Sequence, residues 1–263
     1  MEAIYTVKMN RSAAVPSTPA RPDASFAQAV VEELRVLIVA GIPTGVLVAG
    51  IGSRFAMFVL RLTSPGSVRG VESDDGFTIG RFTLSGTYGL LMIGAVVGVI
   101  GAGAYQWVRP WLLGPSWFRT FTVGLASASV VGAMLVHADG IDFRLLKPAW
   151  LAIALFVALP GLFAISIGLV VDRVERPTSW TRRGRARWLV PAVAVVVFPF
   201  VVVILLFATV VLAVWVAARD DERLRRVAAH HTSGVVIRVG WLGVAVVGLL
   251  TLLNDIREIS AAA

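Results

Sequence analysis

The chain has 263 residues, of which 57% are hydrophobic and 15% are charged, and its mean hydropathy is +0.82. Soluble domains carry about 25% charged residues, and the polar residues here are bunched between long apolar runs, so they cannot cover a water-exposed surface. The net charge is +8, and the absence of cysteine excludes disulfides, thiolate metal sites and thiol chemistry.

These features predict an all-α protein, a polytopic bundle of transmembrane helices. Residues 1–24 mix Ser, Pro, Ala and scattered charges without a period and are predicted to form a flexible tail. They hold no continuous apolar core with a cleavage site, so no signal peptide is expected and the first span should direct insertion. Residues 25–258 are the predicted transmembrane domain, and residues 259–263 are a short C-terminal tail.

The first predicted span begins near Glu33 and ends near Gly52. Extending it would bury Arg54, at a cost of about 2.5–3.5 kcal/mol at a helix centre, so this arginine is placed at the far interface. Residues 55–62 then predict a short amphipathic segment. In the loop that follows, Asp75-Gly76 lies between runs of alternating residues and predicts a small β-hairpin within residues 68–82.

Five further apolar runs predict the remaining spans. They cover residues 84–108, 118–136, 150–171, 188–217 and 233–253. The run at 188–217 is long enough to tilt or to project from the bilayer, and the last run is weaker because Arg238 lies near its start. Most tryptophans fall near the predicted span ends, where their rings prefer the headgroup level. The prediction is six helices, with five as the fallback.

The numbers of basic residues on the two sides of the membrane are nearly equal in this six-helix arrangement, so they hardly determine the orientation. With the N-terminus inside, thirteen Lys and Arg residues lie on the inner side and eleven on the outer side. Cytoplasmic loops are enriched in Lys and Arg. The run from Arg182 to Arg187, the densest and free of acids, favours a cytoplasmic N-terminus, whereas the basic group at 223–226 argues against it.

Small residues recur four positions apart in three of the spans. They are Gly41 and Gly45, Gly94 and Gly98, and Gly124, Ala128 and Gly132. Such a face lets helices approach closely. Packing within one bundle is the simpler interpretation, and an interface with a second copy or with another membrane protein is the alternative.

Arginines beside the spans are candidate ligands for lipid headgroups. One group is Arg54, Arg61 and Arg81 near the predicted hairpin, and the other is Arg182, Arg183, Arg185 and Arg187 on the opposite face. Basic clusters at a membrane attract anionic headgroups, although orientation in the membrane explains the same residues without a ligand. Membrane lipids are the expected partners, and nucleic acid is not expected.

The six-helix arrangement places all three histidines on the outer face, beside several carboxylates. The candidate metal ligands are His137, Asp139, Asp142, His230 and His231. A zinc ion held there with an open position would activate water. No pair has a recognised ligand spacing, so solvated polar residues are the simpler interpretation, and no cofactor is expected.

The sequence contains no P-loop, His-Glu-x-x-His or Gly-x-Ser-x-Gly pattern. No Asp, Glu or Lys lies at a predicted mid-membrane position, which argues against a proton-coupled transporter. The expectation is therefore a non-enzymatic accessory, scaffolding or lipid-associated protein. The alternatives are a transporter of a small neutral or lipid-like solute and a membrane enzyme that uses the outer histidines.

The loop from Glu72 to Thr83 (ESDDGFTIGRFT) runs into a glycine-rich span, and arginine is strongly preferred over lysine. In these features the chain resembles uncharacterised multi-pass membrane proteins of actinobacteria. The resemblance implies a location in a bacterial plasma membrane and carries over no catalytic residue.

Overall fold

The computed structural model describes residues 26–66, 70, 83–138, 140, 143, 145–220 and 231–262. Over these residues the regular elements are helices and no strand occurs, which confirms the all-α prediction. The predicted β-hairpin around Asp75-Gly76 lies outside the described residues, and the structure gives it no support.

The first element is a continuous helix of 38 residues, Phe26–Thr63. Its parts are α1 (Phe26–Val36), η1 (Leu37–Gly41), α2 (Ile42–Thr44), η2 (Gly45–Ile51) and α3 (Gly52–Thr63). The turns of η1 and η2, on either side of Pro43, are of the wider π type. Proline has no N–H and crowds the turn before it, which disfavours ordinary helical bonding there. The predicted first span and the predicted amphipathic segment are thus parts of one helix, and Arg54 lies within it.

Four more long helices follow along the chain. They are α4 (Leu84–Val108) with its extension η4 (Arg109–Trp111), α5 (Ser116–Leu135), α7 (Ala149–Val174) and α11 (His231–Ala262). The Thr83 hydroxyl oxygen caps α4 by accepting a hydrogen bond from the Gly86 N–H at 3.1 Å. With Phe26–Thr63, they make five helices that are long and apolar enough to cross a membrane.

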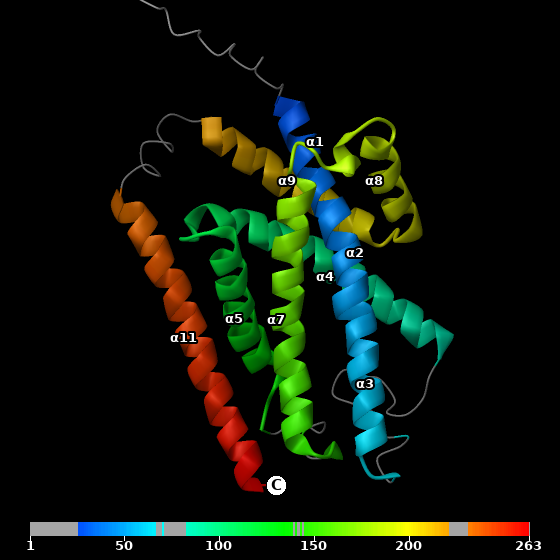
Figure 1. Cartoon of the computed structure of the whole chain (residues 1–263), viewed down its shortest axis with the longest axis vertical. Helices are drawn as coiled ribbons and strands as arrows, with labels where there is room; N and C mark the ends of the chain where they lie inside the picture. The colour runs from blue at the N-terminus through cyan, green and yellow to red at the C-terminus, as the bar shows by residue number, and fades with distance from the viewer. Residues whose placement is uncertain are drawn as a thin grey trace, which may run out of the picture.

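The first helix, α5 and α11 run in one direction and α7 runs in the other, while α4 crosses the bundle obliquely (Figure 1). The chain enters the bundle at the start of α1, and α11 ends at the opposite end of the bundle, where the C-terminus is marked. We call these the N-terminal end and the C-terminal end of the bundle. α5 packs between α7 and α11, and α4 packs against η1 and η2.

The predicted fifth span, residues 188–217, is two helices. The short turn η5 (Trp180–Arg182) precedes α8 (Ala186–Val197), and α9 (Val201–Asp220) follows. Phe198 leaves the helical region, with φ −123° and ψ 67°, because the ring of Pro199 disfavours helical backbone in the residue before it. α8 is about 18 Å long, too short for a hydrocarbon core of about 30 Å. The apolar part of α9 that is described, Val201–Val214, is also shorter than a span, so the described residues support five spans and not six.

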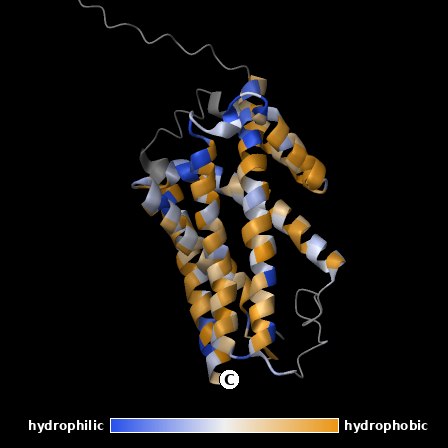
Figure 2. Cartoon of the chain, turned by 45° about the vertical axis from the view of Figure 1, so that its right-hand side comes forward, coloured by the Kyte–Doolittle hydropathy of each residue, from blue (hydrophilic) through white to orange (hydrophobic). Residues whose placement is uncertain are grey.

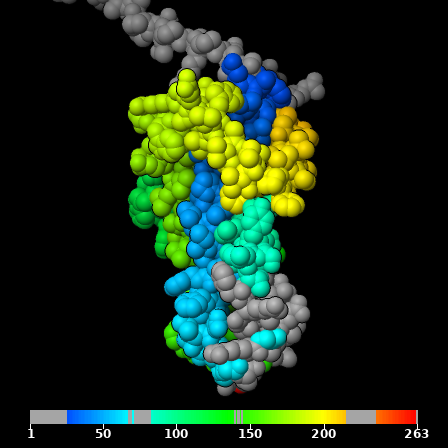
Figure 3. All heavy atoms as spheres, turned by 90° about the vertical axis from the view of Figure 1, so that its right-hand side faces the viewer, coloured from blue at the N-terminus to red at the C-terminus, as the bar shows by residue number. Residues whose placement is uncertain are grey.

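The α8–α9 hairpin stays at the N-terminal end and does not continue through the bundle (Figures 1 and 2). α9 packs against α1 and α4, and α8 packs against η1 and η5. Val201, at the start of α9, is fully buried in the main apolar core, together with residues of the first helix, α4 and α7. Figure 3 shows α8 and α9 beside α1 on this side of the molecule.

Many large apolar side chains face outward. Val196 in α8 is 78% exposed, Phe207 in α9 70% and Leu250 in α11 62%. Figure 2 shows these helices as almost continuously hydrophobic, with the polar residues gathered toward the ends. An apolar outer surface of this extent suits lipid and not water.

Candidate functional site

A network of charged side chains lies at the N-terminal end, where α1, α4, α5 and α7 meet the segment before α8. Its four carboxylates are Glu32, Glu33, Asp172 and Glu175, and its five arginines are Arg35, Arg109, Arg119, Arg182 and Arg187. Buried charges require partners, so the pairing of these groups decides what the site does.

Glu32 is the centre of one half of the network. Its carboxylate accepts from Arg35 at 2.9 Å and from Arg187 at 2.5 Å, and it lies 3.4 Å from the guanidinium of Arg182. The Arg35 side chain is only 4% exposed, and its Nη1 also donates to the carbonyl and hydroxyl oxygens of Thr181 at 3.4 Å. These bonds fasten the segment before α8 to α1.

Arg109 is the centre of the other half. Its guanidinium forms ion pairs with Asp172, at 3.0 Å, and with Glu175, both at the end of α7. One turn earlier in α4, the Gln106 amide donates to the Glu33 carboxylate at 2.8 Å. These bonds connect the end of α4 to α7 and to α1.

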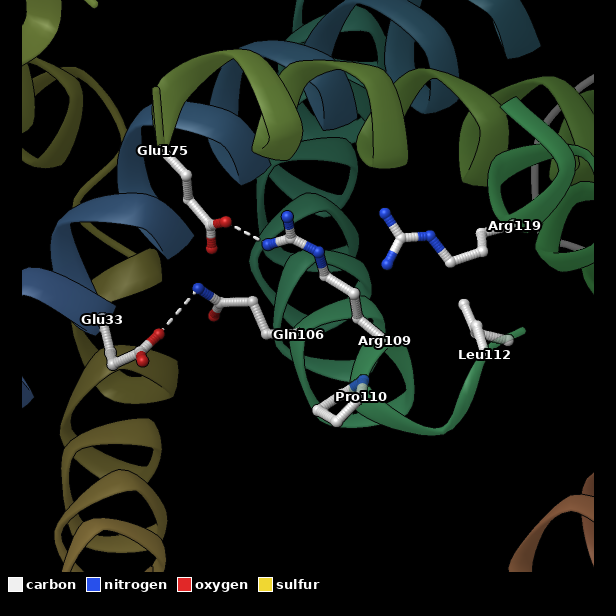
Figure 4. Close-up of a pocket in the computed structure, with 7 residues that line it drawn as sticks. All are labelled: Glu33, Gln106, Arg109, Pro110, Leu112, Arg119 and Glu175. Carbon is white, nitrogen blue, oxygen red and sulfur yellow. Dashed lines mark hydrogen bonds and ion pairs between the residues drawn. The ribbon is translucent and has the colours of Figure 1, made fainter. Parts of the chain in front are cut away.

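A pocket of about 300 Å³ opens among these residues. Figure 4 shows Glu33, Gln106 and Glu175 on one side, Arg109 in the middle, and Arg119 on the other side. Gln106 is only 8% exposed, and its Oε1 has no hydrogen-bond partner among the described residues. Buried amide oxygens are nearly always bonded, so this atom is an available acceptor.

Arg119 is the one arginine of the network without an ion pair to a described carboxylate. Its Nε is buried and has no hydrogen-bond partner in the described part of the chain. In Figure 4 its guanidinium points toward that of Arg109, whose charge is already met by Asp172 and Glu175. The pocket thus carries an unmatched donor and an unmatched acceptor.

The predicted lipid-binding arginines of residues 182–187, which we call the arginine segment, divide into two pairs. Arg182 and Arg187 are tied to Glu32, and Arg187 also lies 5.4 Å from the ring centre of Trp188. Arg183 and Arg185 are exposed. Of the other predicted group, Arg54 and Arg61 are partly buried in α3, and Arg81 lies outside the described residues.

The small residues form close contacts inside the bundle. A Cβ on Gly45 would lie 2.0 Å from the carbonyl oxygen of Gly94, and one on Gly98 would lie 2.0 Å from that of Gly41. Gly124, Ala128 and Gly132 on α5 face α7. A Cβ added to Gly124 would lie 2.5 Å from Ile165, and one added to Gly132 would lie 3.3 Å from Val157. A Cβ added to Gly161 of α7 would lie 3.2 Å from the Cβ of Ala128. These faces join helices of one chain.

Two of the predicted metal ligands, His137 and His231, lie among the described residues, and they are at opposite ends of the bundle. His137 follows α5 at the C-terminal end, whereas His231 begins α11 at the N-terminal end (Figure 1). Asp139, Asp142 and His230 lie outside the described residues. The described residues hold no group of three or more potential ligands. The six-helix arrangement placed these histidines together because it counted α8 and α9 as one crossing.

Sequence reasoning missed most of the charged network. Glu32 and Arg35 are three residues apart, and this spacing alone predicts an ion pair on one helix face. The partners from α4 and α7 depend on which helix ends meet, and no local pattern reports that. Arg238, at the start of the last helix, also has a partner, because its Nε donates to the carbonyl oxygen of Trp111 at 3.1 Å.

Five membrane-length helices with a charged network and pocket at one end therefore define this chain as a helical protein with the features of a membrane bundle. Comparison with protein-family models, curated protein sequences and solved structures found no match.

Proposed function

We propose that the chain is a multi-pass protein of a bacterial plasma membrane whose N-terminal end faces the cytoplasm and binds anionic lipid headgroups through the arginine segment. In this proposal it is a lipid-associated accessory or scaffolding protein and not an enzyme. The observation that carries the proposal is the exposure of Arg183 and Arg185 between two outward-facing tryptophans.

The orientation follows from counting basic residues with five crossings. Among the described side chains, ten arginines lie at the N-terminal end: Arg35, Arg109, Arg119, Arg173, Arg176, Arg182, Arg183, Arg185, Arg187 and Arg238. Four basic residues lie toward the C-terminal end: Arg54, Arg61, Lys147 and Arg257. Short cytoplasmic loops carry the excess of Lys and Arg, so this distribution supports a cytoplasmic N-terminus.

The surroundings of the arginine segment support a headgroup site. Trp180 is 65% exposed and Trp188 is 61% exposed, and tryptophan prefers the headgroup level. The apolar α8–α9 hairpin begins at Ala186, directly after Arg185, so its insertion would hold Arg183 and Arg185 at the membrane surface. Because Arg182 and Arg187 satisfy Glu32, the segment is anchored while its other two arginines are available.

The natural lack of cysteine permits a direct test of the topology. Single cysteines replacing Ala138, Ser179, Thr232 and Ser260 would be probed in intact cells with a membrane-impermeant maleimide. We expect labelling at 138 and 260 and protection at 179 and 232. Protection at 138 and 260 with labelling at 179 and 232 would reverse the orientation. Labelling at both 138 and 232 would contradict the five-helix arrangement.

The lipid preference is tested with Arg183→Ala/Arg185→Ala. Each basic residue near an anionic surface contributes about 1 kcal/mol, so the double variant should lose about 2 kcal/mol, or roughly 30-fold, in preference for phosphatidylglycerol over phosphatidylcholine. Native mass spectrometry of the purified chain titrated with each lipid measures this preference.

The matched control is Arg61→Ala/Arg257→Ala, which removes the same charge from the C-terminal end. It should retain the wild-type preference for phosphatidylglycerol. Equal losses in the two double variants would mean that net charge alone attracts the lipid, and the arginine segment would then not be the site.

A further inference from the structure

The pocket beside Arg109 contains two buried polar groups of opposite character that the described protein does not satisfy. Gln106 Oε1 is a buried acceptor without a donor, and Arg119 Nε is a buried donor without an acceptor among the described residues. Both residues line the same cavity of about 300 Å³, from the end of α4 and the first turn of α5. A single ligand that satisfies both needs a hydrogen-bond donor and an anionic group.

The charged residues that line the pocket restrict the chemical class of the ligand further. Two carboxylates, Glu33 and Glu175, and two arginines, Arg109 and Arg119, line the pocket, and Asp172 pairs with Arg109 from outside the lining. A bound ligand therefore meets both signs of charge, and each charged group on it needs a partner of opposite sign in this partly buried site. The acidic Glu33 lies next to Gln106, whereas Arg119 lies beyond Arg109 (Figure 4). Negative and positive charge are therefore separated across the pocket.

We propose that this pocket binds a small zwitterion that carries a protonated amine and an oxyanion. The amine donates to Gln106 Oε1 and to the Glu33 carboxylate, and the oxyanion pairs with Arg119. Its chemical class includes the phosphoethanolamine headgroup of a lipid and free amino acids. Arg183 and Arg185 do not line this pocket, so the proposal does not depend on lipid binding by these two arginines.

The test uses the full chain in detergent. Native mass spectrometry would compare phosphatidylethanolamine with phosphatidylcholine, which carries the same phosphate but has no N–H to donate. Thermal unfolding would be followed with soluble phosphoethanolamine and with glycine. We expect one tightly bound zwitterion and at least tenfold weaker binding in Arg119→Gln, since hydrogen bonds to charged groups contribute strongly. Gln106→Leu should reduce the preference for a primary amine over choline.

These measurements distinguish a lipid ligand from a soluble one, and they distinguish binding in the pocket from binding at the arginine segment. Binding of phosphatidylethanolamine alone assigns the pocket to a lipid, and stabilisation by phosphoethanolamine or glycine assigns it to a soluble zwitterion. Arg183→Ala/Arg185→Ala should leave this single-site binding unchanged, whereas it removes the preference for phosphatidylglycerol. Equal binding of the ethanolamine and choline lipids, combined with no stabilisation by either soluble compound, would overturn the proposal. Because this outcome is measured on the wild-type protein, it tests the proposal even if Arg119→Gln does not fold.

Discussion

A single added methyl group at Gly45 is expected to separate the first helix from α4. In Gly45→Ala, the new Cβ would lie 2.0 Å from the carbonyl oxygen of Gly94 and 2.7 Å from the Cα of Gly98. Both are backbone atoms, so no side chain can rotate away and the helices must move apart. Overpacking usually costs about 1–3 kcal/mol, and we expect a loss above about 3 kcal/mol here. The measurement is the thermal unfolding temperature and monodisperse yield in detergent.

The control for this prediction is Gly243→Ala in α11. A Cβ there would meet nothing within 4 Å among the described residues, so the unfolding temperature should stay at the wild-type value. Gly98→Ala, which would place its Cβ 2.0 Å from the Gly41 carbonyl oxygen, should behave like Gly45→Ala. If Gly45→Ala unfolds at the wild-type temperature, the close contact between these two helices is wrong.

Removing the Glu32 carboxylate is expected to produce the second large loss of stability. In Glu32→Gln, Arg35 keeps a charge that is 4% exposed and loses its ion pair. Breaking a buried pair typically costs about 3–5 kcal/mol, and the lower end applies here because Glu32 is itself 28% exposed. The same thermal unfolding assay measures the loss. Arg182 and Arg187 should contribute little to it, because both are exposed to water.

The double variant Glu32→Gln/Arg35→Met distinguishes the effect of an unpaired buried charge from that of a general folding defect. Removing both charges leaves no buried unpaired ion, because Arg182 and Arg187 are partly exposed, so the double variant should recover most of the stability lost in the single variant. Glu258→Gln, at an exposed position near the C-terminus, is the control and should unfold as the wild type does. A double variant no more stable than Glu32→Gln would show that Arg35 is not the cause.

The class of the fold was predictable because hydropathy and charge spacing report the helices directly. The number of spans was not, since residues 188–217 are uniformly apolar and hydropathy does not register a change of direction. The signal for the break was Phe198-Pro199-Phe200, where proline disfavours helical backbone in the preceding residue. Proline also occurs inside transmembrane helices, and Pro160 lies within α7 without ending it.

The candidate site was less predictable than the fold. The four-residue spacing of Gly41 and Gly45 identified a helix face, but which helix it meets depends on how distant segments pack. The same limit applied to Glu33 and Gln106, whose bond joins residues 73 positions apart. Arg182 and Arg187 form ion pairs with Glu32, which distinguishes them from the other predicted lipid-binding arginines, and no feature of the run itself indicated this.

The α8–α9 hairpin has a mechanical consequence for a surrounding bilayer. The hairpin adds helices at one end of the bundle only. In the proposed membrane arrangement the protein would therefore displace more lipid from one leaflet than from the other, and this would couple it to membrane curvature. The molecule would then be most stable where the leaflet that holds the hairpin is expanded relative to its partner.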